Sequence, residues 1–355
     1  MELLILEGDG IGPDIAKATI SVLDVIGEQY DLDLSMTWKT IGLASLARSG
    51  TTFPLDVLQA AREADGTILG PVSHNDYPPV AEGGVNPSGA LRKGLDLYAN
   101  IRPSKTRKGF PPPCGKPLDL VIVRENTEGF YSDRSMHLGP GEFMPTPDLA
   151  MSLRKVSREG STRIAEAAFK LAMTRPRQKV TSVHKANVLR VSDGLFLECV
   201  REVAGRYPNV AYEERIVDAM AAYLVRDASV FDVIVTTNMF GDILSDEASE
   251  LSGSLGLAGS LNASDTHAIA QAQHGSAPDI AGQGIANPTS LIASAAMLLS
   301  WLGEKRADRR LFRAAEEIEM ALDLTIANPS TRTRDLGGTI SLTPAEPRSG
   351  LLPAT

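Results

Sequence analysis

Short apolar runs alternate with amphipathic stretches along the chain. The first run, residues 3–6, leads into a glycine-rich turn and then into an amphipathic stretch that begins at Pro13 and extends to Tyr30. Because proline suits the first turn of a helix, we expect a strand, a loop and a helix here. Further runs of strand length lie at residues 67–69, 118–123, 180–183 and 231–236.

Helical patterns lie between these runs. In residues 161–173, one face of a helix would carry Ile164, Ala168, Leu171 and Ala172. This alternation predicts an α/β fold with a parallel or mixed sheet flanked by helices. Residues 130–147 are rich in Gly, Pro, Met and Ser and lack a helical period, so we expect an arm that reaches a partner subunit.

Length and composition narrow the class of protein. A chain of 355 residues exceeds the size at which single hydrophobic cores usually stop growing, so we expect two domains with a cleft between them. No apolar run is long enough to span a membrane. The net charge of −9 disfavours nucleic acid or an anionic membrane as the partner. The two cysteines, Cys114 and Cys199, match no metal-binding or redox spacing, which agrees with a reducing compartment. Because no basic leader precedes residue 3, we expect a cytoplasmic protein.

Two segments are rich in glycine. The turn at residues 8–12 reads Gly-Asp-Gly-Ile-Gly and lacks the third glycine of the dinucleotide-binding fingerprint, so alone it indicates only a tight turn. Residues 274–288 also contain many small residues, which let backbone approach a flat ligand closely. At this length and composition, an ordinary surface loop is the weaker interpretation of the second segment.

Arg92, Arg102 and Arg124 form a candidate anion-binding set. Arg124 ends an apolar run, and Arg102 lies directly before a proline. A guanidinium group binds a carboxylate through paired donors, so three together would suit a di- or tricarboxylic acid. Taken singly, each arginine is better explained by a surface ion pair.

Asp242 and Asp246 lie four residues apart, just after the apolar run that ends at residue 236. If a helix begins there, both carboxylates share one face about one turn apart and can hold one divalent cation. The alternative is that Asp242 interacts with the helix N-terminus while Asp246 is solvated. Asp218 interrupts an apolar stretch, and an acid among apolar neighbours needs a partner such as a metal.

Lys185 and Tyr131 are candidates for proton transfer. Lys185 closely follows the apolar run at residues 180–183, and Tyr131 follows the segment Glu-Asn-Thr-Glu-Gly at residues 125–129. A lysine in a closed cleft can accept a proton from a hydroxyl group, and a tyrosine can serve as the matching acid. A lone lysine or tyrosine is more often structural, so both interpretations depend on the whole set.

Together these segments resemble the β-decarboxylating dehydrogenases, a family that includes isocitrate, homoisocitrate, 3-isopropylmalate, tartrate and D-malate dehydrogenases. The resemblance runs from Leu3 to about Gly338. It is carried by the arginine set and by residues 8–13, 123–129, 185–187, 238–246 and 274–288.

The resemblance implies a particular division of the chain. A first, cofactor-binding domain would contain both chain ends, residues 1–100 and 250–355. A second domain, residues 101–249, would serve dimerisation, metal and substrate. The protein would be a homodimer, because each active site of this family takes its lysine and one metal-binding aspartate, here Lys185 and Asp218, from the neighbouring subunit.

The resemblance also implies the reaction and the role of each residue. NAD would oxidise the 2-hydroxyl of a 3-substituted malate, and the β-carboxylate would leave as carbon dioxide. Lys185 would accept the hydroxyl proton, and Tyr131 would assist protonation at C3. The substrate would bind Ser88, Arg92, Arg102 and Arg124. The cation, Mg²⁺ or Mn²⁺, would bind Asp218, Asp242 and Asp246. The cofactor would contact Ile11, His274, Gly275, Ser276, Ala277, Pro278, Asp279 and Asn287.

The same comparison indicates the cofactor. NADP-dependent members tend to carry a Lys-Tyr pair after their His-Gly-Thr-Ala-Pro block, whereas this chain has Asp279 and Ile280. A carboxylate accepts hydrogen bonds from both ribose hydroxyls and repels a 2′-phosphate, so we expect NAD. Asn287 would face the adenine.

Substrate choice depends on the residues before Arg92. Isopropylmalate dehydrogenases carry a Glu-x-x-Leu-Leu pattern there, and Ser88 and Gly89 replace the leucine pair. Isocitrate dehydrogenases carry Ser-x-Asn, and residues 86–88 have the same polar types in reverse order. We therefore expect isocitrate or a homoisocitrate-like substrate, with 3-isopropylmalate, D-malate and tartrate as alternatives.

Two remoter alternatives stay open. The 4-phosphohydroxythreonine dehydrogenases resemble the chain at residues 274–288 but do not require the arginine set or the aspartate pair. A non-catalytic regulatory subunit typically loses metal or arginine positions, all of which are present here.

Overall fold

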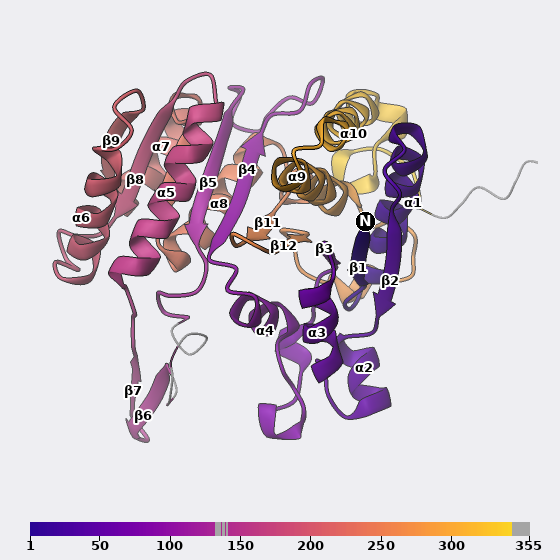
Figure 1. Cartoon of the computed structure of the whole chain (residues 1–355), viewed down its shortest axis with the longest axis horizontal. Coiled ribbons are helices and arrows are strands. Elements are labelled where there is room, and N and C mark those ends of the chain that lie inside the picture. The colour runs from indigo at the N-terminus through magenta and orange to yellow at the C-terminus, as the bar shows by residue number, and fades with distance from the viewer. Residues whose placement is uncertain (132–135, 137–138, 140, 343–355) are drawn as a thin grey trace, which may run out of the picture.

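The computed structural model describes residues 1–131, 136, 139 and 141–342. Within these residues, a ten-stranded sheet runs through the molecule, with helices on both faces (Figure 1). Its strand order is β2 (Ser35–Lys39), β1 (Glu2–Leu6), β3 (Gly66–Leu69), β12 (Ala268–Gln271), β11 (Leu261–Ala263), β4 (Ala99–Lys105), β5 (Asp119–Glu125), β10 (Val233–Thr236), β8 (Lys179–His184) and β9 (Ala211–Ile216).

The sheet is parallel at both edges and antiparallel in the middle. The pairs β12–β11, β11–β4 and β4–β5 are antiparallel, and the remaining neighbours are parallel. Strands from the two ends of the chain lie together in one half, and strands from the middle form the other half. The predicted α/β fold with a mixed sheet is confirmed, while the domain boundaries near residues 100 and 250 stay a prediction.

Helices bury both faces of each half-sheet, which explains why the strands read as continuous apolar runs. In β1, Leu3 and Ile5 pack towards one face and Leu4 and Leu6 towards the other. The first face is covered by α1 (Gly12–Tyr30), α9 (Thr289–Arg306) and α10 (Arg309–Ala327), and the second by α3 (Leu55–Glu63) and α4 (Pro87–Gly94). Helix α2 (Gly42–Ser49) follows Ile41, which is buried in the second core. On the other half-sheet, α5 (Arg158–Thr174) and α6 (Ser192–Ala204) cover one face, and α7 (Val217–Asp227) and α8 (Asn238–Ser252) cover the other.

The elements predicted from apolar runs occur within a few residues of their expected bounds. Helix α1 follows the glycine turn with Pro13 in its first turn, and α5 buries Ile164, Ala168 and Ala172. The pattern missed β4, because Pro103 lies inside it. Proline is tolerated there because β11 pairs only with residues 99–101, so the edge beside Pro103 is open on that side.

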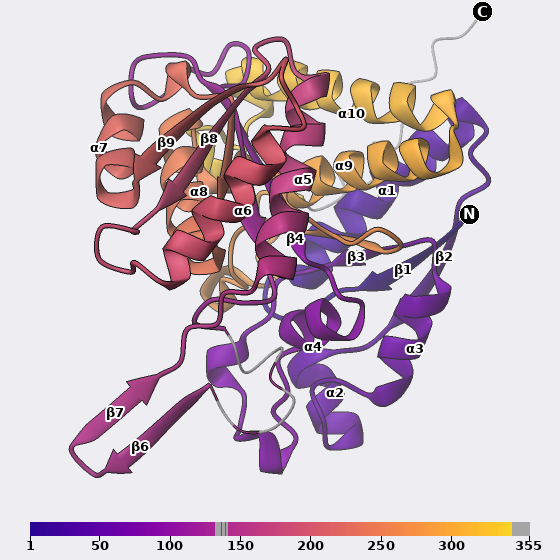
Figure 2. The ribbon, with the colours of Figure 1, turned by 60° about the vertical axis from the view of Figure 1, so that its left-hand side comes forward.

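The segment at residues 130–147 contains no helix in its described part. A hairpin of β6 (Glu142–Thr146) and β7 (Leu149–Ser152) projects from the body of the molecule (Figure 2). Exposed apolar side chains on this hairpin include Phe143, Met144, Leu149 and Met151. Residues 132–135, 137–138 and 140 of the predicted arm lie outside the described residues, and its contact with a partner stays a prediction.

Both cysteines are free; Cys199 is buried and Cys114 is partly exposed. Within the described ranges, no helix is long and apolar enough to cross a bilayer.

Candidate active site

The glycine turn contacts the loop that begins at His274. The Ile11 backbone N–H donates to the Ser276 carbonyl at 2.8 Å. Gly10 has φ of +58°, and a Cβ atom there would lie 2.0 Å from the same carbonyl oxygen. Gly8 also has a positive φ, and its Cβ would meet the Pro71 carbonyl at 2.1 Å. Glycine is thus required by both backbone conformation and close approach, so this turn is a structural part of the site.

Replacing Gly10 with alanine should therefore displace the His274 loop. We expect the KM for the predicted nucleotide cofactor to rise roughly tenfold or more and the melting temperature to fall by several degrees, because strain and a backbone clash together cost several kcal/mol. Steady-state kinetics and thermal denaturation would measure both effects. Gly50→Ala is the matched control, since Gly50 has a positive φ but open space around its Cβ position. It should lower stability without changing KM, and an unchanged KM in Gly10→Ala would contradict the role of the turn.

A cavity of about 330 Å³ lies beside this turn and loop. Five predicted cofactor residues line it: Ile11, His274, Gly275, Ala277 and Asn287. Ser276 is buried behind the loop, where its hydroxyl group hydrogen-bonds that of Ser73 at 2.7 Å. Pro278 and Asp279, in the short 3-10 helix Pro278–Ile280, are exposed and do not line the cavity. The loop thus brings most, but not all, of the predicted cofactor residues together.

A second cavity of about 280 Å³ shares His274 and Gly275 with the first. Six residues predicted for substrate, catalysis or metal line it: Ser88, Arg92, Arg102, Arg124, Tyr131 and Asp242. Helix α4 supplies Ser88 and Arg92 on one face, and it begins with an Asn86 cap and with Pro87 in its first turn. Strands β4 and β5 supply Arg102 and Arg124, and α8 supplies Asp242.

Arg102 and Arg124 are buried and pair with the aspartates of α8. Arg124 has a side chain only 2% exposed, and it donates to Asp242 and, through Nε, to Asn238 at 2.9 Å. Helix α8 can approach Arg124 because Gly241 has no side chain; a Cβ there would lie 2.6 Å from the arginine Cγ. Arg102 donates to Asp242 at 3.1 Å and to Asp246 at 3.2 Å. Buried guanidinium groups need such partners, since an uncompensated buried charge is costly.

Burial and the neighbouring charges shift the pKa values of Arg102 and Asp242. Burial and the neighbouring Arg124 lower the pKa of Arg102 to about 10, so Arg102 stays cationic at neutral pH. Burial alone would raise the pKa of Asp242, but Arg124, Arg102 and Arg92 outweigh it and hold that pKa below its usual value. The cavity therefore carries cationic arginines and an ionised Asp242 near neutral pH.

The aspartate pair fits a divalent cation in its geometry and donor chemistry. Asp242 and Asp246 lie one turn apart on the same face of α8, and each places its Oδ1 atom near one atom, Arg102 Nη1. Two converging carboxylate oxygens are suitable ligands for Mg²⁺ or Mn²⁺. Across the described part of the chain, no group of three His, Cys, Asp or Glu side chains could hold a metal ion. Asp242 and Asp246 are thus the described carboxylates that converge at this point.

Tyr131, Ser88 and Arg92 complete the wall of the second cavity. The Tyr131 hydroxyl donates to Asp242 Oδ2 at 3.2 Å, and the Arg124 guanidinium lies 5.7 Å from the centre of the tyrosine ring. Ser88 Oγ donates to Gln271 Oε1 at 3.1 Å, and Arg92 Nη2 approaches the same oxygen at 3.5 Å. Tyr131 therefore lies where an acid–base group of this cavity is expected.

Lys185 and Asp218 do not lie in this cavity. They form an ion pair with each other, Lys185 just after β8 and Asp218 in the first turn of α7. The Asp218 side chain is 68% exposed, and Lys185 is its partner within this chain. A metal at Asp218 stays a prediction.

The prediction missed several polar residues of the site. Gln271 binds Ser88 and Arg92, and Gln273 donates to Asp246 Oδ1 at 3.0 Å. Asp335, from the 3-10 helix Arg334–Leu336, lines the first cavity and accepts from Asn287 at 2.8 Å. Two isolated glutamines and an aspartate far away in the chain form no motif whose spacing could be recognised in the sequence. Gln271 and Gln273 could have been found only from their position directly before His274.

His274 separates the two cavities. Burial lowers the pKa of His274, so its imidazole is neutral at neutral pH. The Nδ1 atom lies 2.9 Å from the Gly275 carbonyl, which makes Nδ1 the protonated nitrogen. The neutral ring can therefore form the boundary of both cavities without adding a cation to the arginine set.

Comparison with known proteins agrees with this geometry. The model of the isocitrate/isopropylmalate dehydrogenase family matches residues 2–346. The chain therefore belongs to the isocitrate/isopropylmalate dehydrogenase family, and the resemblance inferred from its sequence is confirmed.

Individual relatives include more than one specificity. The isocitrate/homoisocitrate dehydrogenase of Thermus thermophilus is 43% identical over 338 residues, which cover 95% of this chain and 93% of that protein. The 3-isopropylmalate dehydrogenase of Methanothermobacter thermautotrophicus is 41% identical, over 95% of this chain and 94% of that protein. A crystal structure of isocitrate dehydrogenase from Methylococcus capsulatus matches with a TM-score of 0.83 and 39% identity, over 94% of this chain and 93% of that one.

Proposed function

We propose that this protein is a cytoplasmic, homodimeric, NAD-dependent dehydrogenase that oxidises and decarboxylates a 3-substituted malate. The observation that carries the proposal is the sharing of His274 and Gly275 by two cavities. One cavity is lined by the small-residue loop and the other by three arginines and Asp242. A flat cofactor in the first would therefore lie beside a polycarboxylate in the second.

The arginines would bind and orient the substrate carboxylates. Arg92, Arg102 and Arg124 reach the cavity from α4, β4 and β5, so they can contact carboxylates from different sides. Asp242 and Asp246, with Asp218 from a second copy, would hold Mg²⁺ or Mn²⁺. A divalent cation supplies Lewis acidity towards the hydroxyl and stabilises negative charge, and the nicotinamide ring supplies the hydride acceptor.

Two residues would move the protons. Lys185 from the second copy would accept the proton of the 2-hydroxyl as C2 is oxidised. Tyr131, whose hydroxyl lies 3.2 Å from Asp242, would donate a proton to C3 after carbon dioxide has left. Asp242 would keep the Tyr131 hydroxyl oriented towards the substrate.

Dimerisation is supported by exposed apolar side chains beside both parts of the proposed site. Ile243, next to Asp242, is exposed on α8, and Val188 and Val191 are exposed shortly after Lys185. Exposed apolar side chains gain free energy when a partner surface covers them. Pairing two copies through these surfaces would cover them and could bring Lys185 and Asp218 of one copy towards Asp242 of the other.

NAD rather than NADP is the proposed cofactor, because Asp279 and Asp335 add negative charge near the first cavity. The double change Asp279→Lys and Ile280→Tyr should shift the ratio of kcat/KM for NADP over NAD by roughly 100-fold, since it replaces a repulsive carboxylate with a cation for the 2′-phosphate. Steady-state kinetics with both cofactors would measure this ratio. Asp24→Lys, at an exposed site on α1, should leave it unchanged; an equal shift there would contradict a local effect.

An isocitrate-like substrate is favoured by polar groups near Arg92. Ser88 and Gln271 line the second cavity and hydrogen-bond each other, so a polar substituent at C3 would find partners there. We expect the highest kcat/KM on isocitrate or homoisocitrate in a panel with 3-isopropylmalate, D-malate and tartrate, assayed with NAD and Mn²⁺. Preference for 3-isopropylmalate would establish the alternative, and lack of turnover on every member would overturn the proposal.

A further inference from the structure

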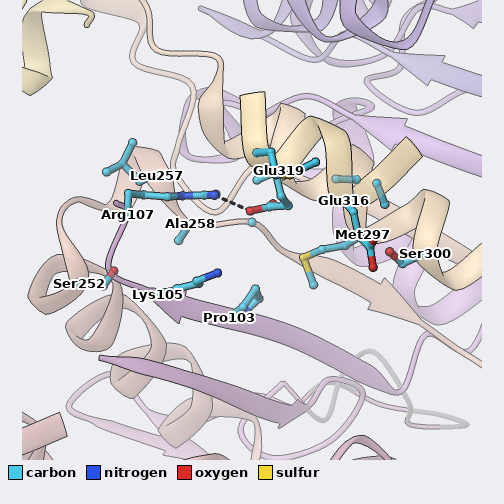
Figure 3. Close-up of a pocket in the computed structure, with 15 residues that line it drawn as sticks. Pro103, Lys105, Arg107, Ser252, Leu257, Ala258, Met297, Ser300, Glu316 and Glu319 are labelled. Carbon is cyan, nitrogen blue, oxygen red and sulfur yellow. Dashed lines mark hydrogen bonds and ion pairs between the residues drawn. The ribbon is translucent and has the colours of Figure 1, made fainter. Parts of the chain in front are cut away.

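A third cavity, of about 490 Å³, lies apart from both cavities of the candidate active site (Figure 3). It lies between strand β4 and helices α9 and α10, and we call it the α9–α10 cavity. It shares no lining residue with the other two. Its size is within the range of small-molecule sites.

Strand β4 lies between this cavity and the second cavity of the candidate active site. We call that second cavity the arginine pocket, because Arg92, Arg102 and Arg124 line it. Successive side chains of a strand point to opposite faces. Arg102 points towards Asp242, and Ser104 Oγ lies 3.2 Å from Ser249 Oγ of α8. Pro103 and Lys105 are on the other face and line the α9–α10 cavity. A ligand in this cavity would therefore contact the strand that positions Arg102.

Most of the cavity wall is apolar, and the positive charge of one wall residue, Arg107, is neutralised by ion pairs. Arg107 is buried and forms ion pairs with Glu319 and, at 3.2 Å, with Asp323. Figure 3 shows the Arg107–Glu319 pair at one end of the cavity. The apolar wall is formed by Leu257, Ala258, Ala293, Ala296, Met297, Ala315 and Met320.

Two charged side chains of the wall remain, Lys105 and Glu316. Among the described residues, neither forms a hydrogen bond or an ion pair with another side chain. In Figure 3, Lys105 lies on one side of Met297, and Glu316 lies with Ser300 on the other. The cavity thus has a cationic end and an anionic end separated by an apolar surface.

We propose that the α9–α10 cavity binds a small zwitterion in which an apolar spacer separates a carboxylate from an ammonium group, as in an ω-amino acid. The carboxylate would pair with Lys105, the ammonium group with Glu316, and the spacer would pack on Met297. A di- or tricarboxylate is disfavoured, because a further carboxylate would face Glu316. The site therefore selects against the substrates of the arginine pocket.

Isothermal titration calorimetry on the full chain tests this site with 6-aminohexanoate as the probe. Hexanoate and hexylamine each lack one charge, and glycine lacks the spacer. We expect 6-aminohexanoate to bind and each of the other three to bind roughly tenfold or more weakly, because each loses a charge-assisted contact or the apolar one. Lys105→Gln and Glu316→Gln should each weaken binding of 6-aminohexanoate to a similar extent.

Two matched controls separate this site from general attraction to the protein. Lys108→Gln and Glu304→Gln change exposed charges that do not line the cavity, and they should leave the affinity unchanged. Since the arginine pocket also attracts carboxylates, binding that persists in Lys105→Gln and Glu316→Gln would belong to that pocket and would overturn the proposal. Failure of 6-aminohexanoate to bind the parent protein at millimolar concentration would overturn it too.

Discussion

Asp242→Asn should lower kcat/KM by roughly a thousandfold or more and raise the Mn²⁺ concentration needed for half-maximal activity. Asp242 holds two buried arginines and, in the proposed mechanism, is a ligand of the divalent cation. A bound cation contributes several kcal/mol of transition-state stabilisation, and about 4 kcal/mol corresponds to a factor of about a thousand. Initial rates against isocitrate over a range of Mn²⁺ concentrations would measure both effects.

Glu247→Gln is the matched control on the same helix. Burial raises the pKa of Glu247, and Glu247 lines neither cavity of the candidate site, so its replacement by the isosteric glutamine removes a carboxylate of the same helix away from the site. We expect near-normal activity and cation dependence. If Asp242→Asn retained normal turnover while remaining folded by circular dichroism, the proposed cation site would be wrong.

Lys185→Met should lower kcat by roughly 100- to 10,000-fold, which is the usual contribution of a general base. The KM for substrate should change little, because the arginines and Ser88 would still bind the carboxylates. Stopped-flow and steady-state measurements of NADH formation between pH 6 and 10 would show these effects.

Lys179→Met provides the control for Lys185. Lys179 lies at the other end of strand β8 and pairs with Glu213, so its loss removes an ion pair of the same strand without touching the proposed site. We expect a small change in stability and unchanged kcat. A similar fall in kcat for both variants would indicate a structural effect and contradict the role of Lys185.

The sequence predicted the fold best where a local pattern carried the information. The strands β1, β5 and β10 contain continuous apolar runs because helices cover both of their faces. Strand β4 was not predicted as a strand, because its proline is tolerated only through the pairing of a short neighbour, β11. That pairing joins residues far apart in the chain, and no local pattern reports it.

The residues of the candidate site could be predicted from the sequence where they belong to a motif with a recognisable spacing. The aspartates of α8 share one face as their spacing requires, and the arginines meet in one cavity. The sequence indicated only a tight turn at residues 8–12. The requirement for glycine at position 10 comes from the close approach of the Ser276 carbonyl, which lies far away in the chain. Gln271, Gln273 and Asp335 were missed for a related reason: single polar residues acquire a role only through tertiary contacts.

Lys185 and Asp218 are predicted site residues that do not line the cavity of the arginines. They pair with each other outside the cavity of the arginines, and within the described residues the aspartates of α8 have no third carboxylate with which to hold a cation. The proposed function therefore depends on completion of each site by a second copy.

Complementation between two inactive variants tests this claim most directly. A hybrid dimer of Lys185→Met and Asp242→Asn chains, purified with two different affinity tags, would contain one site with both changes and one site with neither if the sites are shared. If the sites are shared, we expect this hybrid to have about half of the parent activity, although each variant alone is inactive. A hybrid as inactive as its parents would contradict it, because self-contained sites would each carry one of the two changes.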